Sequence, residues 1–137
     1  MKRSERADGW YQQALHDMDM ARAMAREGFY DGCAFACQQA VELVIKALWM
    51  DVRGGDPPRT HWAERLAADL QAPDEIIEHT NMVVPDYTAS RYPDAAGAMP
   101  YLLYHLEEAE DRLRRAQAIL NWASAMWEND DSQEHLG

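Results

Sequence analysis

The chain has 137 residues, of which 47% are hydrophobic and 27% are charged, and 24 Asp and Glu against 13 Lys and Arg give a net charge of −11. This length and composition predict one globular domain over residues 1–137 and exclude both a disordered chain and a two-domain enzyme. The acidic balance excludes a nucleic-acid-binding surface over the whole molecule, although it leaves room for a local basic patch.

Three features of the sequence bear on where the protein resides. The unbroken apolar runs are only a few residues long, so we expect no membrane-spanning segment. The charged start MKRSERADGW has no apolar stretch behind it, so we expect no secretory signal. Because Cys33 and Cys37 lie in one short stretch and make no disulfide framework, we expect a cytoplasmic protein.

The first predicted element is a helix over Glu5–Arg26, whose apolar residues recur at helical spacing on one face: Trp10, Ala14, Met18, Ala21 and Ala25. Gly28 is a suitable stop, because glycine accepts the left-handed backbone that ends helices. The short turn that follows favours an antiparallel neighbour.

A second helix is predicted from about Tyr30 to Val52, and its stretch Ala34–Met50 is apolar on almost every side. The hydrophilic side chains in that stretch form one narrow stripe: Gln38, Gln39, Glu42 and Lys46. A helix that is apolar nearly all round packs on several sides, so we expect a central rod, partly covered by a second subunit. The segment RGGDPPR then forms a loop.

Short helices separated by prolines are predicted next. One covers about His61–Leu70, and another begins at Pro73. Pro85 lacks the amide donor that a helix interior needs, so we predict a kink or restart there. The restarted helix ends at Pro93, and residues 94–100 form a loop.

The last predicted helix runs from Pro100 to about Trp127, with a seam that belongs to the core or to a dimer contact: Leu102, Leu106, Ala109, Leu113, Ala116, Leu120, Ala123 and Trp127. We expect the acidic tail, about residues 128–137, to be frayed. With no strand-like alternation, the pattern predicts an all-α, up-and-down bundle of about five helices.

Several of these segments together resemble the HEPN domain (higher eukaryotes and prokaryotes nucleotide-binding domain) over about Glu5–Met126. They are QQAVELVIKALW after GFYDGCAFA, an isolated His61 after the loop, YTASRYPD, a tryptophan in the first helix and the closing ILNWA. The resemblance implies a four- or five-helix bundle that forms homodimers. It also implies a neighbouring minimal nucleotidyltransferase, in pairs that behave as toxin and antitoxin.

Some HEPN proteins are metal-independent ribonucleases that carry an arginine, four to six residues and a histidine, whereas others bind nucleotide or a partner protein. This sequence departs from the nuclease pattern. After Arg91 the next histidine is His105, and neither Arg53 nor Arg59 stands at the required distance from His61. We therefore do not predict the standard ribonuclease activity, and Gly54 and Gly55 lack the flanking residues of a phosphate-binding P-loop.

The stripe on the second helix has two interpretations. Glu42 precedes Lys46 by four residues, which is the favourable order for a helical ion pair that fixes register or the dimer. Alternatively, the stripe is the floor of a ligand cleft in which Gln39 contacts a base or ribose.

Tyr87, Arg91 and Tyr92 are the strongest candidates for ligand binding. Arg91 carries a planar fork that suits phosphate, and the tyrosines can stack on a base. The alternative is that Arg91 pairs with Glu42 or Asp86 inside the bundle while the tyrosines close the core.

His61 is a weak candidate for general acid–base catalysis, with a helix cap or a packed residue as its alternative. Cys33 and Cys37 are interpreted as buried small residues, and the other histidines have no ligand spacing, so we expect no metal and no cofactor.

Our first hypothesis is thus a homodimeric HEPN partner of a nucleotidyltransferase that binds nucleotide or RNA near Gln39, Glu42, Lys46, Tyr87 and Arg91. The alternatives are a divergent ribonuclease that uses Arg91 or His61, and a dimerisation module without a ligand.

Overall fold

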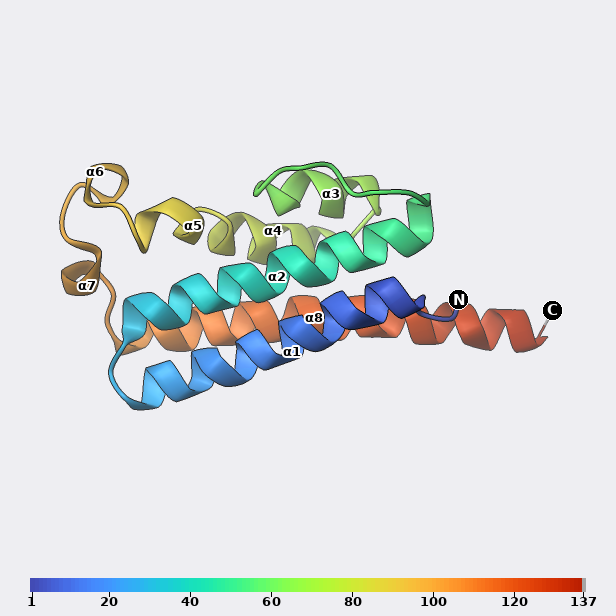
Figure 1. Ribbon diagram of the computed structural model, residues 1–137, viewed down its shortest axis with the longest axis horizontal. Coiled ribbons are helices and arrows are strands. Elements are labelled where there is room, and N and C mark those ends of the chain that lie inside the picture. The colour runs from blue at the N-terminus through green and yellow to red at the C-terminus, as the bar shows by residue number, and fades with distance from the viewer. Residues whose placement is uncertain (137) are drawn as a thin grey trace.

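The computed structural model describes the backbone of residues 1–136 and the side chains of residues 1–129, and the regular structure of this part is entirely helical. Three long helices, α1 (Glu5–Arg26), α2 (Tyr30–Arg53) and α8 (Leu106–Leu136), lie side by side. The shorter α4 (Asp74–Val83) packs across α2 and α8. In Figure 1, α2 and α8 run in one direction, and α1 and α4 run in the other. The predicted all-α, up-and-down bundle is therefore confirmed.

The hairpin of α1 and α2 follows the sequence closely. The side chain of Ser4 caps α1 by accepting a hydrogen bond from the Ala7 amide at 3.1 Å, so the helix begins at Glu5 as predicted. Gly28 has a φ of +84° in the turn, and the Phe29 amide donates to the Met24 carbonyl at 2.8 Å. The left-handed backbone at the glycine lets α2 return antiparallel to α1.

Replacing Gly28 by alanine is expected to lower the free energy of unfolding by about 1 kcal/mol, because an L side chain is strained at this positive φ. A Cβ at Gly28 would meet nothing within 4 Å, so strain alone is measured. Gly9 is the matched control, since it is helical and equally open, and its replacement by alanine is expected to raise the same quantity by about 0.5–1 kcal/mol. Urea denaturation followed by circular dichroism measures both, and equal effects of the two substitutions would contradict this account.

The predicted central rod is confirmed, because α2 forms the middle of the core. Its apolar side chains are almost completely covered, mainly by α1 and α8: Cys33, Ala34, Ala36, Cys37, Ala40, Val41, Val44, Ile45, Ala47 and Leu48. Within the described residues, α2 alone has the length and apolar composition to cross a membrane, but 72% of that stretch is buried inside the fold. This burial marks it as the core helix of a bundle.

Asp51, at the far end of α2, ties the rod to its two long neighbours. Its Oδ2 accepts hydrogen bonds from the Ser4 amide and from Trp127 Nε1, each at 3.0 Å. The Trp127 ring also packs edge-on against Tyr11, with ring centroids 5.7 Å apart. One carboxylate therefore links the start of α1 to α8.

The middle of the chain is more broken than predicted. The helix expected from His61 begins later, as α3 (Ala63–Asp69). The helix expected from Pro73 begins one residue later, as α4, with Pro73 as its N-cap. Pro85 separates α4 from a one-turn helix, α5 (Asp86–Ala89), which confirms the predicted restart. The predicted end at Pro93 is wrong, because this helix already ends at Ala89. The predicted loop of residues 94–100 is partly wrong, because α6 (Pro93–Ala96) forms a further turn that ends at Gly97, where φ is +79°.

The prediction of one unbroken last helix from Pro100 is also wrong. A single turn, α7 (Pro100–Leu103), is followed by an extended residue, Tyr104, and only then by α8. As a result, the seam begins outside the core: Leu102 is 59% exposed and Leu106 is 47% exposed. From Ala109 onward its residues pack inward, apart from Leu113, which is half-buried.

The helix also continues beyond the predicted end at Trp127, since α8 reaches Leu136. The expectation of a frayed tail over about residues 128–137 stays a prediction, since most of this tail lies outside the residues whose side chains are described.

Candidate functional site

The hydrophilic stripe of α2 is a hydrogen-bonded chain. Lys46 Nζ lies 3.2 Å from Glu42 Oε2, and the two side chains are only 11% and 13% exposed. Gln38 donates to Glu42 Oε1 at 3.2 Å, and Gln39 donates to Gln38 at 2.6 Å. The predicted ion pair is therefore formed, and Glu42 is the acceptor that holds the stripe together.

His61 joins this stripe from the loop before α3. Its Nδ1 lies 3.0 Å from Glu42 Oε1, and its ring stacks on Tyr87 with centroids 3.9 Å apart and planes inclined by 17°. Tyr87 lies on α5, the one-turn helix that follows Pro85. Two residues that are 26 positions apart in the sequence thus form one flat aromatic pair.

Arg91 continues the same line at its other end. Its guanidinium carbon lies 5.8 Å from the centre of the Phe35 ring, and Phe35 packs against Tyr87 with centroids 6.2 Å apart. We call this continuous series of contacts the Arg91–Lys46 row, which consists of Arg91, Phe35, Tyr87, His61, Glu42 and Lys46.

The row contains most of the predicted site residues but not all of them. Gln39 touches it only through Gln38, and Tyr92 is exposed at the start of α6, away from these contacts. Phe35 was not predicted, although its position seven residues before Glu42 places it on the same face of α2. The alternative that Arg91 pairs with Glu42 or Asp86 is wrong, since Arg91 is exposed and forms no ion pair with either carboxylate among the described residues.

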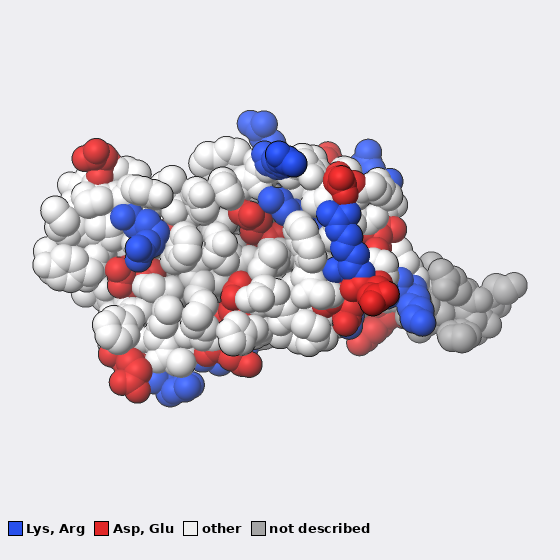
Figure 2. All heavy atoms as spheres, viewed as in Figure 1, with Lys and Arg blue, Asp and Glu red and all other residues white. Residues whose placement is uncertain are grey.

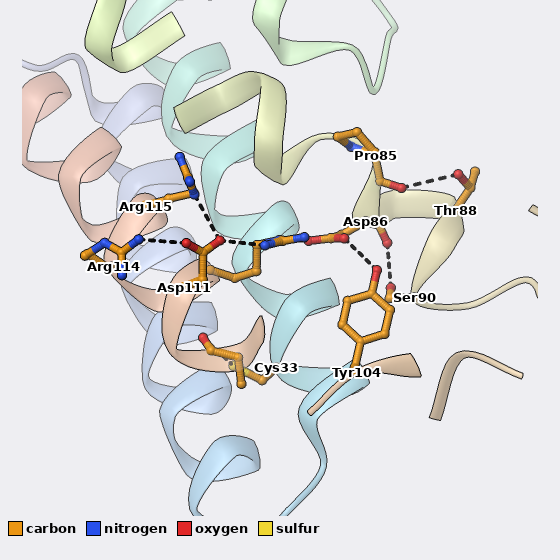
Figure 3. A network of polar contacts seen from close by, with 11 residues as sticks. Cys33, Pro85, Asp86, Thr88, Ser90, Tyr104, Asp111, Arg114 and Arg115 are labelled. Carbon is orange, nitrogen blue, oxygen red and sulfur yellow. Dashed lines mark hydrogen bonds and ion pairs between the residues drawn. The ribbon is translucent and has the colours of Figure 1, made fainter. Parts of the chain in front are cut away.

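A second polar network, which the sequence did not reveal, surrounds Asp86 (Figure 3). Asp86 is 2% exposed, and it accepts hydrogen bonds from Tyr104 Oη at 2.6 Å and from Arg112 Nε at 2.5 Å. Arg112 also donates to Asp111, which accepts further bonds from Arg114 and Arg115. Burial raises the pKa of Asp86, although the Tyr104 and Arg112 hydrogen bonds oppose that shift. The Asp86–Arg112 part of this network is buried, whereas its far end at Arg114 is exposed to solvent.

A small cavity of about 190 Å³ opens beside the Lys46 end of the row. It is lined by residues from α1, α2 and the loop between α2 and α3: Arg6, Trp10, Lys46, Asp56, Pro57, Pro58 and Arg59. A larger, open hollow of about 570 Å³ lies near the N-terminus, where Arg3 pairs with Asp8 and covers the Tyr11 ring. Of these two hollows, only the smaller one adjoins a predicted site residue.

Metal ligation has no candidate in the described part of the chain, where no three His, Cys, Asp or Glu side chains gather in a suitable cluster. Cys33 and Cys37 are free and buried. The hydrogen bond with Cys33, together with burial, raises the pKa of the Cys37 thiol.

Exposed apolar side chains gather between α5 and α8, in a segment that we call the 92–106 patch. Its members are Tyr92, Met99, Tyr101, Leu102, Leu103 and Leu106. Monomeric proteins rarely leave so many large apolar side chains together in water, so a surface of this kind is typical of an interface.

Comparisons with known proteins agree on one family. The HEPN domain profile matches residues 7–127. The fold is similar to TT1696 from Thermus thermophilus, with 33% identity and a TM-score of 0.82 over 89% of this chain and 98% of that one. It is also similar to ST0689, an archaeal HEPN homologue, with 30% identity and a TM-score of 0.77 over 93% and 99% of the two chains. No curated protein matches the sequence.

Proposed function

The chain belongs to the HEPN domain family, and from this premise we propose that it is the homodimeric partner subunit of a minimal nucleotidyltransferase, in a pair of the toxin–antitoxin kind. We further propose that it binds nucleotide or RNA along the Arg91–Lys46 row. The site would be held within one domain over residues 1–137.

The observation that carries the ligand proposal is the His61–Tyr87 stack beside an exposed arginine. Stacked rings offer a flat face to a nucleobase, and the Arg91 guanidinium offers a fork that matches phosphate. Glu42 fixes the orientation of His61 through its hydrogen bond, so the aromatic face is ordered before a ligand arrives. Preorganisation of this kind lowers the entropic cost of binding.

Ligand binding is tested with Tyr87→Ala and Arg91→Ala. Each is expected to weaken the affinity for a fluorescein-labelled single-stranded RNA about tenfold or more, because one loses a stacking surface and the other a phosphate contact. Arg114→Ala, in an exposed arginine on α8, is the control and is expected to leave the affinity within about twofold. Fluorescence anisotropy gives the dissociation constants, and equal losses in all three variants would contradict the proposed site.

The 92–106 patch supports the dimer. Leu102→Glu is expected to convert the protein to a monomer, because a charge in a desolvated apolar interface has no partner. Met82→Glu changes an exposed apolar residue outside the patch and is expected to leave the dimer intact. Sedimentation velocity distinguishes the monomer from the dimer for both variants. If Leu102→Glu remains a dimer, the 92–106 patch is not the dimer interface.

The nucleotidyltransferase partner is tested by size-exclusion chromatography of this protein mixed with the protein encoded by the adjacent gene. Separate elution of the two proteins would contradict a stable complex.

A divergent metal-independent ribonuclease is the second candidate, because the fold brings His61 and Arg91 onto one row and pairs His61 with a carboxylate. Such a histidine–carboxylate pair suits general acid–base chemistry. Incubation with structured RNA in EDTA tests it. Cleavage that is lost in both His61→Ala and Arg91→Ala supports the enzyme, and no cleavage by the parent protein contradicts it.

A further inference from the structure

Basic side chains are more frequent in the first half of this acidic chain than in the second. Nine of the 13 Lys and Arg residues lie in residues 1–65, which also contain only ten of the 24 Asp and Glu residues. Figure 2 shows several of them gathered where α1 begins and α2 ends. The cavity beside Lys46 lies at this end, and three of the residues that line it are cationic: Arg6, Lys46 and Arg59.

Inside the cavity the cations already hold an anion. Arg6 Nη1 lies 2.5 Å from Asp56 Oδ1, while these side chains remain 54% and 83% exposed. The hydrogen bond from Arg6 and the nearby charges of Arg6 and Arg59 lower the pKa of the Asp56 carboxyl. Exposed ion pairs contribute little to stability, so this contact can be exchanged for another anion at low cost.

The loop that carries Asp56 is suited to such an exchange. Gly54 and Gly55 both have positive φ, at +74° and +96°, directly before the aspartate. Neither glycine has an atom within 4 Å of the place where a Cβ would stand, so the loop is open around them. The Arg6 guanidinium also lies 5.8 Å from the Trp10 ring, which positions the cation on the cavity wall.

The cavity and the Arg91–Lys46 row share Lys46. Along α2, the distance from Phe35, under Arg91, to Lys46 is about 16 Å at 1.5 Å per residue. A cation therefore stands at each end of the row, with three aromatic rings and the Glu42 carboxylate between the two cations. This arrangement suits a strand with phosphates at both ends and a base between them.

We propose that the cavity of Arg6, Arg59 and Lys46 is the phosphate-binding subsite of the nucleotide or RNA site, in which a ligand phosphate takes the place of the Asp56 carboxylate. This assignment rests on the proposed function and gives the site a direction, with the phosphate at the α1–α2 end and the base on His61 and Tyr87. Phosphate is common to free nucleotides and to an RNA strand, and the probes below distinguish these two sources.

The direct test is binding of inorganic tripolyphosphate, measured by isothermal titration calorimetry on the full chain. Arg59→Glu is expected to weaken binding at least tenfold, because it places a negative charge in the cavity. Asp56→Asn is expected to strengthen it about threefold or more, because it removes the competing carboxylate. Arg26→Glu is the matched control at the other end of α1, about 30 Å away, and is expected to change the affinity less than twofold.

Failure of this subsite is distinguishable from failure of the proposed function. If tripolyphosphate does not bind, or if Arg59→Glu and Arg26→Glu change its affinity equally, the proposed subsite is wrong. This conclusion holds whether or not RNA binds along the Arg91–Lys46 row. The opposite outcome is also defined. If the Asp56 and Arg59 substitutions change the affinity for tripolyphosphate but Tyr87→Ala leaves the RNA affinity unchanged, the subsite is supported and RNA binding along the row is contradicted. An RNA hexanucleotide that binds at least tenfold more tightly than adenosine 5′-monophosphate indicates that the ligand is an RNA strand, and equal affinities indicate a free nucleotide. Either result supports the subsite if Arg59→Glu weakens binding of the probe.

Discussion

Replacing Asp86 by alanine is expected to lower the free energy of unfolding by about 3–5 kcal/mol, because it breaks a buried ion pair from one side. The Arg112 side chain is 15% exposed and would lose its Asp86 contact, and the Tyr104 hydroxyl would lose its acceptor. Asp111 still accepts a hydrogen bond from Arg112, which places the expected loss near the lower value.

Two variants separate the parts of this effect. Tyr104→Phe removes one hydrogen bond and is expected to cost about 1 kcal/mol. Asp94→Ala removes an exposed carboxylate from α6 and is expected to change stability by less than about 0.5 kcal/mol. Urea denaturation followed by tryptophan fluorescence measures all three, and an Asp86→Ala loss no larger than that of Tyr104→Phe would contradict the importance of the ion pair.

Replacing Glu42 by alanine is expected to lower the free energy of unfolding by about 3 kcal/mol, because the charged Lys46 side chain would stay largely covered without its partner. Gln38 and His61 would lose an acceptor in the same change. RNA affinity is expected to fall about tenfold as well, since His61 would no longer be held against Tyr87.

The double variant Glu42→Leu with Lys46→Leu distinguishes the two roles of this pair. Apolar residues of similar size often replace a buried ion pair without loss, so stability is expected to return to within about 1 kcal/mol of the parent protein. RNA affinity is expected to remain low. Recovery of both stability and affinity would show that the pair has no part in ligand binding.

The sequence predicted α1 and α2 well because their signals are local. The spacing of Trp10, Ala14 and Met18 and the stop at Gly28 predicted the apolar face and the end of α1, whereas the Ser4 cap became evident only in the structure. The interior position of α2 followed in the same way, since a single polar stripe on an apolar helix leaves few ways to pack it. The Glu42–Lys46 pair is one helical turn long and needed no tertiary information.

Contacts between distant segments explain what the sequence did not predict. The seam of leucines runs without a slip through Leu102 and Leu106, yet the helix breaks at Tyr104. The Tyr104 hydroxyl donates a hydrogen bond to Asp86, which lies 18 residues earlier in the chain. The spacing of apolar residues carries no information about a hydrogen bond between such distant positions. The His61–Tyr87 stack likewise depends on where the loop and α5 meet, so the two residues were separate candidates in the sequence.

The most direct test of the Arg91–Lys46 row is an NMR titration of the full chain with single-stranded RNA, observed at the aromatic resonances of His61, Tyr87 and Phe35. The account predicts that these three change first and together, at the same concentration as the Arg91 guanidinium signal, while Arg114 and the Tyr104 ring stay unchanged. Changes confined to the 92–106 patch or to α8, with the His61 and Tyr87 resonances unmoved at saturation, would contradict it.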